Sequence, residues 1–211
     1  MSPENKKLVL STLIMVITLV MLVMGAAYAY FSADNTIDNN TTKIETTIED
    51  VGIVSLKAGK DLSLNISAVQ MMKQTGDVEY YATESGTPST SANTVAIATA
   101  DVEGNGTMSC NYQLKAEISG TNNMYTVFNN MSTKSVGQLV LNVDGVEYDF
   151  YSTTFPKTIT GTLTGLKEGS PKNIMASFKV VNKSSIDQSD LAGTDLTITF
   201  AVEQLNCNLV G

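Results

Sequence analysis

The stretch MSCNYQLKAEI, residues 108–118, decides the fold of this chain. Every second residue is apolar or aromatic, and the residues between them are polar. Side chains of a β-strand point alternately to its two faces, so this pattern predicts a strand with one buried face. The same period of two recurs in four further segments: residues 61–68, 138–151, 172–181 and 195–205.

Residues 138–151 predict a β-hairpin. Asp144-Gly145 separates two alternating runs, and both residue types suit the positive φ angles of a two-residue type I′ turn. Shorter strands are expected at residues 53–57, 94–100, 124–128 and 157–163. The one helix that we expect in this region is short and lies around Ala68–Lys73.

Many alternating strands with little helix predict an all-β protein. We expect an antiparallel β-sandwich of the jelly-roll-like kind, preceded by an N-terminal hydrophobic helix or signal segment. The expected division is a signal peptide or signal-anchor helix (1–29), a polar arm (30–50) and the β-sandwich domain (51–211).

The N-terminal segment predicts export from the cell. Lys6 and Lys7 precede an uncharged, apolar run over residues 8–29, which ends in Ala27-Tyr28-Ala29 before Tyr30. Positive residues, an apolar run and an Ala-x-Ala site are the parts of a secretory signal peptide, with Ala27, Ala29 and Tyr30 at the cleavage point. The run is also long enough to span a bilayer as a retained anchor. Both interpretations place the residues after Tyr30 outside the cytoplasm.

Residues 30–50 form a polar stretch rich in Asn and Thr. The plain interpretation is a flexible linker. The alternative is a donor strand, in which Ile37, Ile44 and Ile48 are the side chains that dock on another subunit.

The composition narrows the class of partner. The net charge is −8, all thirteen basic residues are lysines, and the chain has no arginine. A chain of this sign that lacks the guanidinium group is unsuited to nucleic acid, so no nucleic-acid partner is expected.

Cys110 and Cys207 are the only cysteines. In an exported chain, such a pair suggests one disulfide; the alternative is two buried free thiols. Cys207 is out of phase with the inward residues of its own predicted strand, so pairing requires a bulge or a strand end.

The chain has no histidine, which excludes a histidine-containing hydrolytic triad and an HExxH zinc site. Residues 101–106 are similar to the start of a calcium loop, but Tyr112 stands where the bidentate Glu belongs, so a turn is expected. Asp187, Asp190 and Asp195 cluster before the last strand and are expected in a solvated loop. We therefore expect no enzyme, no metal site and no cofactor.

The segment GAAYAYFSADNT, residues 25–36, followed by an all-β ectodomain, resembles the TasA/camelysin group of exported matrix-fibre proteins. Similar chains occur among archaeal bundling pili. The resemblance implies a jelly-roll fold and fibres in which the N-terminal segment of one subunit adds a strand to the next. Camelysin-type members are classed as metallopeptidases, and the missing histidine departs from that role.

The leading expectation is thus an exported structural subunit of a fibre, pilus or surface matrix. Its main partner is itself, as a homopolymer; it meets the membrane during export and other surface or matrix components afterwards. The alternative is a membrane-anchored surface or adhesion module that retains residues 8–29 as a transmembrane or pilin-like core helix.

Overall fold

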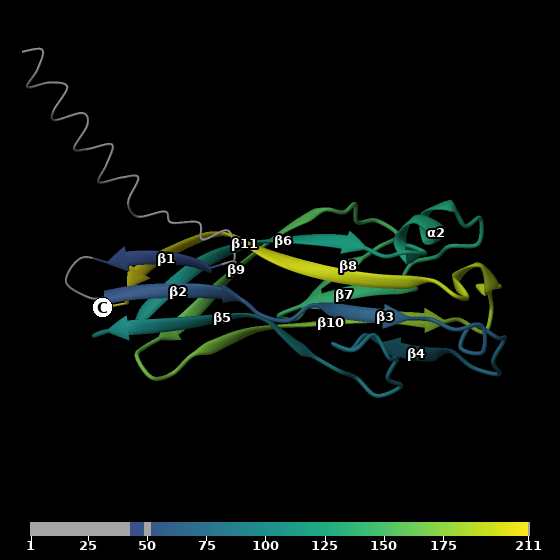
Figure 1. The fold of residues 1–211 in the computed structure, drawn as a ribbon, viewed down its shortest axis with the longest axis horizontal. Coiled ribbons are helices and arrows are strands. Elements are labelled where there is room, and N and C mark those ends of the chain that lie inside the picture. The colour runs from purple at the N-terminus through teal and green to yellow at the C-terminus, as the bar shows by residue number, and fades with distance from the viewer. Residues whose placement is uncertain (1–42, 49–51, 211) are drawn as a thin grey trace, which may run out of the picture. The chain divides into compact units, whose positions relative to one another are not determined.

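The computed structural model describes residues 43–48 and 52–210, and within these ranges the protein is all-β, as predicted (Figure 1). The strands of this part are β1 (Lys43–Ile48), β2 (Gly52–Ala58), β3 (Leu62–Asn65), β4 (Val78–Tyr81), β5 (Val95–Gly104), β6 (Met108–Ser119), β7 (Leu139–Val143), β8 (Val146–Asp149), β9 (Lys157–Leu166), β10 (Lys172–Asn182) and β11 (Asp195–Leu209). The helices are α2 (Met124–Asn130) and the short 3-10 helix η1 (Ser189–Leu191). The apolar run of residues 8–29 lies outside the described ranges.

The strands form two antiparallel sheets. The seven-stranded sheet has the order β1-β2-β5-β10-β7-β8, with β4 also paired to β10. The four-stranded sheet has the order β3-β11-β6-β9. The inward side chains of both sheets meet in one hydrophobic core, in which Leu56, Leu114, Phe178 and Ile198 are fully buried. This burial follows the period of two that the sequence displays.

The predicted hairpin is confirmed. Asp144 has φ 47° and Gly145 has φ 84°, which are the positive values that a type I′ turn requires. The Asp144 carboxylate also accepts hydrogen bonds from the Met175 backbone N–H at 2.9 Å and from the Tyr112 hydroxyl at 3.2 Å. The turn therefore ties β7 and β8 to strands of both sheets.

Two local predictions are wrong. Residues 124–128, expected as a strand, belong to α2, because Asn123 caps the helix by accepting from the Thr126 N–H and because Met124 and Phe128 bury the same helical face. Residues 68–73, expected as a helix, form turns with hydrogen bonds of the i to i+3 kind.

The folded sheet begins before the expected domain boundary at residue 51. Strand β1 lies inside the segment expected as an arm, and it pairs antiparallel with β2 of the same chain, Ile44 opposite Leu56 and Thr46 opposite Val54. Residues 43–48 are thus part of the seven-stranded sheet in this structure.

Candidate functional site: an open edge on the last strand

The neighbouring strands of β11 change along its length. Its first residues, Asp195–Ile198, pair with β3 on one side, and from Thr197 onward the strand pairs with β6 on the other. Beyond Ile198, no strand in the described ranges continues the ladder on the β3 side. Beyond Ile198, β11 therefore has an edge without a backbone partner on that side. We call residues 195–198 the first half of the strand and residues 205–209 its second half.

The first half of β11 is covered by β3, and β3 is covered in turn by a loop. The outer edge of β3 is itself paired with the loop that follows β4: Ser63 and Thr83 exchange two backbone hydrogen bonds, and the Asn65 N–H donates to the Gly86 carbonyl at 2.9 Å. The loop residues that make these bonds are Thr83 and Gly86. The backbone of this loop blunts an edge that would otherwise be free to pair.

A bulge separates the two halves of β11. The register with β6 shifts between Val202 and Gln204, so Glu203 is an extra residue on β11. Before the bulge the even-numbered residues point inward, and after it Leu205 is buried while Asn206 is exposed. The shift reverses which face each later side chain occupies.

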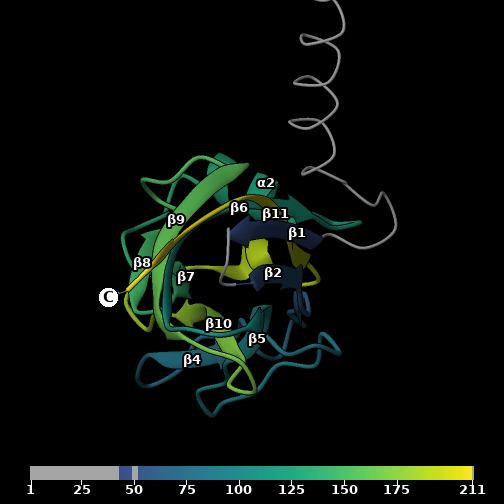
Figure 2. The ribbon, with the colours of Figure 1, turned by 90° about the vertical axis from the view of Figure 1, so that its left-hand side faces the viewer.

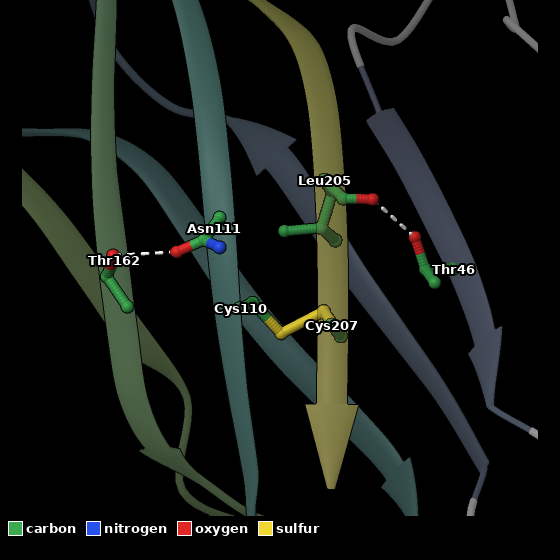
Figure 3. Close-up of a disulfide and its surroundings, with 6 residues drawn as sticks. All are labelled: Thr46, Cys110, Asn111, Thr162, Leu205 and Cys207. Atoms are coloured by element: carbon green, nitrogen blue, oxygen red, sulfur yellow. Dashed lines mark hydrogen bonds between the residues drawn. A yellow bond between two sulfur atoms is a disulfide. The ribbon is translucent and has the colours of Figure 1, made fainter.

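The bulge brings Cys207 into line with Cys110. These residues lie directly opposite each other on β11 and β6, with Cα atoms 4.0 Å apart, and form a disulfide (Figure 3). From the phase mismatch in the sequence, pairing requires a bulge or a strand end, and the structure has a bulge, at Glu203. The bond fastens the second half of β11 to its neighbour.

The direction of the free backbone groups follows from one hydrogen bond. The Val210 N–H donates to the Thr107 carbonyl, on the β6 side, at 2.8 Å. Backbone groups alternate in direction along a strand, so the N–H and C=O groups of Asn206 and Asn208 also point to β6. Those of Leu205, Cys207 and Leu209 point away from it, to the open side. We call these three residues the open edge.

Strand β1 lies beside the open edge without pairing with it (Figures 2 and 3). The two strands point the same way, and Thr46 Oγ1 donates to the Leu205 carbonyl at 2.7 Å. In the described ranges no backbone hydrogen bond joins β1 to β11. Strand β1 thus flanks the open edge, and among the described residues the hydrogen bond from Thr46 to Leu205 joins the two.

Two ion pairs lie on the strands that flank β11. Lys43 and Glu45 form an ion pair on β1, and Lys115 and Glu117 form one on β6. The hydrogen bond to Glu117 raises the pKa of Lys115, and the field of Glu203 adds to the effect. The open edge itself offers a ligand its backbone N–H and C=O groups and the apolar side chain of Leu209, which is 51% exposed.

The structure describes only part of the predicted binding and cleavage residues. Ala27, Ala29, Tyr30 and Ile37 lie outside the described ranges. Ile48 ends β1, and Ile44, also on β1, is half-buried and packs against the core of its own chain. Thr46, which contacts the open edge, was missed, because a threonine in a polar Thr-rich stretch carries no distinguishing sequence signal.

The acidic residues considered for calcium are engaged locally. Both carboxylate oxygens of Asp195 accept backbone N–H groups, from Thr121 and Asn122. Asp187 accepts from the Ser189 N–H at 2.9 Å, and this hydrogen bond lowers the pKa of Asp187. Asp101 belongs to β5. Within residues 43–48 and 52–210, no three Cys, Asp or Glu side chains gather as metal ligands.

No helix in the described part of the chain has the length and apolar character needed to cross a bilayer. Comparison with protein-family models, with curated proteins and with solved structures finds no match. The features that bear on function are therefore the residues themselves and the geometry of the open edge.

Proposed function

We propose that this protein is an exported structural subunit of an extracellular fibre, which assembles when the N-terminal segment of one copy adds a strand to the next. The observation that carries the proposal is the open edge at Leu205, Cys207 and Leu209. Unpaired strand backbone is a template for another strand, and such pairing is a known mode of recognition.

The donor that we propose is the segment between the export signal and β1, residues 30–42. These thirteen residues can extend over roughly 43–47 Å, at about 3.3–3.6 Å per residue. Pairing with residues 205–209 takes about 17 Å of strand, at 3.3–3.4 Å per residue. The segment is therefore long enough to leave its own subunit and pair with a second one.

Ile37 is the docking side chain that we assign to this contact. Ile44 is half-buried and already packs against the core of its own chain, so it holds β1 in place at the root of the donor segment. The incoming strand would separate β1 from the open edge, which costs the hydrogen bond from Thr46 to Leu205. New backbone hydrogen bonds along the edge offset that loss.

The contact is head-to-tail, because the donor segment and the open edge are different surfaces of the same chain. A heterologous contact that does not close produces a filament. The fold and the resemblance of residues 25–36 to the TasA/camelysin group support a jelly-roll-like subunit of this kind. The apolar run at 8–29 and the disulfide support an oxidising, extracellular location.

The test is negative-stain electron microscopy of protein purified from its producer. We expect fibres from the unaltered chain, and none when residues 30–42 are deleted with β1 left intact. Ile37→Asp should also abolish them, whereas the neighbouring control Thr36→Asp should not. Normal fibres from the deletion variant would contradict the proposal.

A second candidate function is a membrane-anchored surface module. The observation in its favour is the length of the apolar run, because residues 8–29 exceed the usual apolar core of a signal peptide and suffice to span a bilayer. Intact mass and N-terminal sequencing distinguish the two: a chain starting at Tyr30 supports the fibre subunit, and a chain retaining Leu8 supports the anchored module.

A further inference from the structure

The outer face of the four-stranded sheet contains a second feature, unrelated to the open edge. A hollow of about 290 Å³ lies on this face, where β6, β9 and β11 run side by side. Tyr112 and Gly161, which pair across β6 and β9, are also among its lining residues. The side chains around it belong to Asn111, Gln113, Thr160, Thr162, Gln204 and Asn206, and we call this set the amide hollow.

Strand register explains why these side chains gather. Asn111 on β6 is paired with Thr162 on β9 and with Asn206 on β11. In the next row, Gln113 is paired with Thr160 and Gln204. Residues paired across strands share a face, so the hollow consists of two rows of three polar side chains.

The amide hollow has unused hydrogen-bonding capacity. The Thr162 hydroxyl donates to Asn111 Oδ1 at 2.7 Å, which fixes the side chain of Asn111 and leaves its NH₂ group directed elsewhere (Figure 3). Among the described residues, the side-chain amides of Gln113, Gln204 and Asn206 make no hydrogen bond. Each amide offers two donors and an acceptor to a ligand.

The hollow is also uncharged, in a chain of net charge −8. The adjacent row of β6 carries Lys115, which pairs with Glu117 and is not part of the lining. An ionic ligand would find no opposite charge here. Large apolar side chains and Arg, which mark the centres of protein–protein interfaces, are absent from the six side chains.

We propose that the amide hollow binds an uncharged polysaccharide. Sugar hydroxyls donate and accept at once, and paired amide and hydroxyl side chains provide both functions at close spacing. The exposed row Thr158, Thr160, Thr162 and Thr164 continues the polar surface along β9, on which an extended chain can lie. The site is independent of fibre assembly, because it lies on a sheet face rather than at an edge.

The experiment is a pull-down of the detergent-solubilised full chain on insoluble polysaccharides. The uncharged probes are amorphous cellulose, curdlan and cross-linked dextran, and alginate beads provide an anionic comparison. We expect retention on at least one uncharged probe that persists at 1 M NaCl, since no ion pair contributes, and no retention on alginate.

The variant Gln113→Ala/Asn206→Ala should reduce the bound fraction by about tenfold, as expected for the loss of two or more hydrogen bonds. The matched control Asn105→Ala/Asn173→Ala removes two exposed amides elsewhere and should bind normally. Circular dichroism checks that both variants are folded. Retention on no uncharged probe overturns the proposal, and so does equal retention of the two double variants. Altered bundling of the variant with unchanged retention would assign the face to a second copy and also overturn it.

Discussion

The two halves of β11 have the same neighbour on one side and opposite situations on the other. Over Asp195–Ile198 the strand pairs with β3, and from Thr197 also with β6; a loop backbone then covers β3. Over Leu205–Leu209 the strand has β6 on one side and β1 on the other, and among the described residues one hydrogen bond, from the Thr46 hydroxyl to the Leu205 carbonyl, joins β1 to it. The first half of β11 has no free backbone edge, whereas the second half has backbone N–H and C=O groups that can pair with another strand.

Strand β10 of the other sheet is a long strand that has partners along most of one side. On one side, β5 pairs with residues 172–176 and β4 pairs with residues 179–182. On the other side, β7 pairs with residues 176–180. The open edge of β11 is therefore a local feature and not a general consequence of strand length. The predictions below test this difference between the two halves, beginning with the largest expected effect.

Removal of the disulfide should have the largest effect. The variant Cys110→Ala/Cys207→Ala should lower the free energy of unfolding by about 2–5 kcal/mol, because the bond closes a long loop. Denaturant unfolding measures the loss. Amide exchange should rise more over residues 205–209 than over 195–198, since only the second half depends on this bond. Equal loosening of both halves would contradict the comparison.

Proline substitutions test the direction of the backbone groups. Asn208→Pro should lower the free energy of unfolding by about 1–3 kcal/mol, because it leaves a carbonyl on β6 without its donor. Leu209→Pro should cost less than about 1 kcal/mol, because the N–H it removes points to the open side. The reverse order in denaturant unfolding would mean that the open edge is assigned to the wrong residues. Leu209→Pro should nevertheless reduce fibre formation.

The contact between β1 and β11 should have a smaller effect. Thr46→Val keeps the shape of the side chain and removes its hydrogen bond to the Leu205 carbonyl, which should cost about 0.5–1.5 kcal/mol. Thr47→Val, on the exposed face of the same strand, should change stability by less than about 0.5 kcal/mol. Equal effects of the two variants in thermal unfolding would show that β1 is not attached through Thr46.

A substitution on β4, the strand that pairs with β10, should have the smallest effect on stability, and this effect should depend on pH. Hydrogen bonds from Lys179, at 2.6 Å, and from Tyr81 lower the pKa of Glu79. A lowered folded pKa gives stability that is present above the unfolded pKa of about 4.3 and is lost as the pH falls through the folded pKa. Both partners are partly exposed, so Glu79→Gln should cost less than about 1 kcal/mol at pH 7 and nothing at pH 2. A cost of the same size at both pH values would contradict this account.

Much of the described fold could be predicted from alternation alone. The strands over 108–118, 172–181 and 195–205 and the Asp144-Gly145 turn followed from residue types at fixed spacing. The phase of Cys207 indicated that pairing needs a bulge or a strand end, because two bonded cysteines on paired strands must share a face. Strand β4 was missed because its four residues, VEYY, show no alternation of apolar and polar side chains.

The candidate site was harder to predict, because an edge is defined by which strand is absent beside it. Pairing partners far apart in sequence determine that, and no residue type marks it. Helix α2 was assigned as a strand for a related reason: its apolar residues also suit a strand, and the signals that decide are the Asn123 cap and the spacing of Met124 and Phe128.

The most direct test of the open edge is residue-resolved amide hydrogen exchange by NMR, before and after assembly. In the monomer we predict rapid exchange at Leu205, Cys207 and Leu209 and protection at Asn206 and Asn208, whose N–H groups bind β6. On assembly, the three fast amides should become protected. Protection of all five amides in the monomer, or fast exchange at the same three in the fibre, would contradict the account.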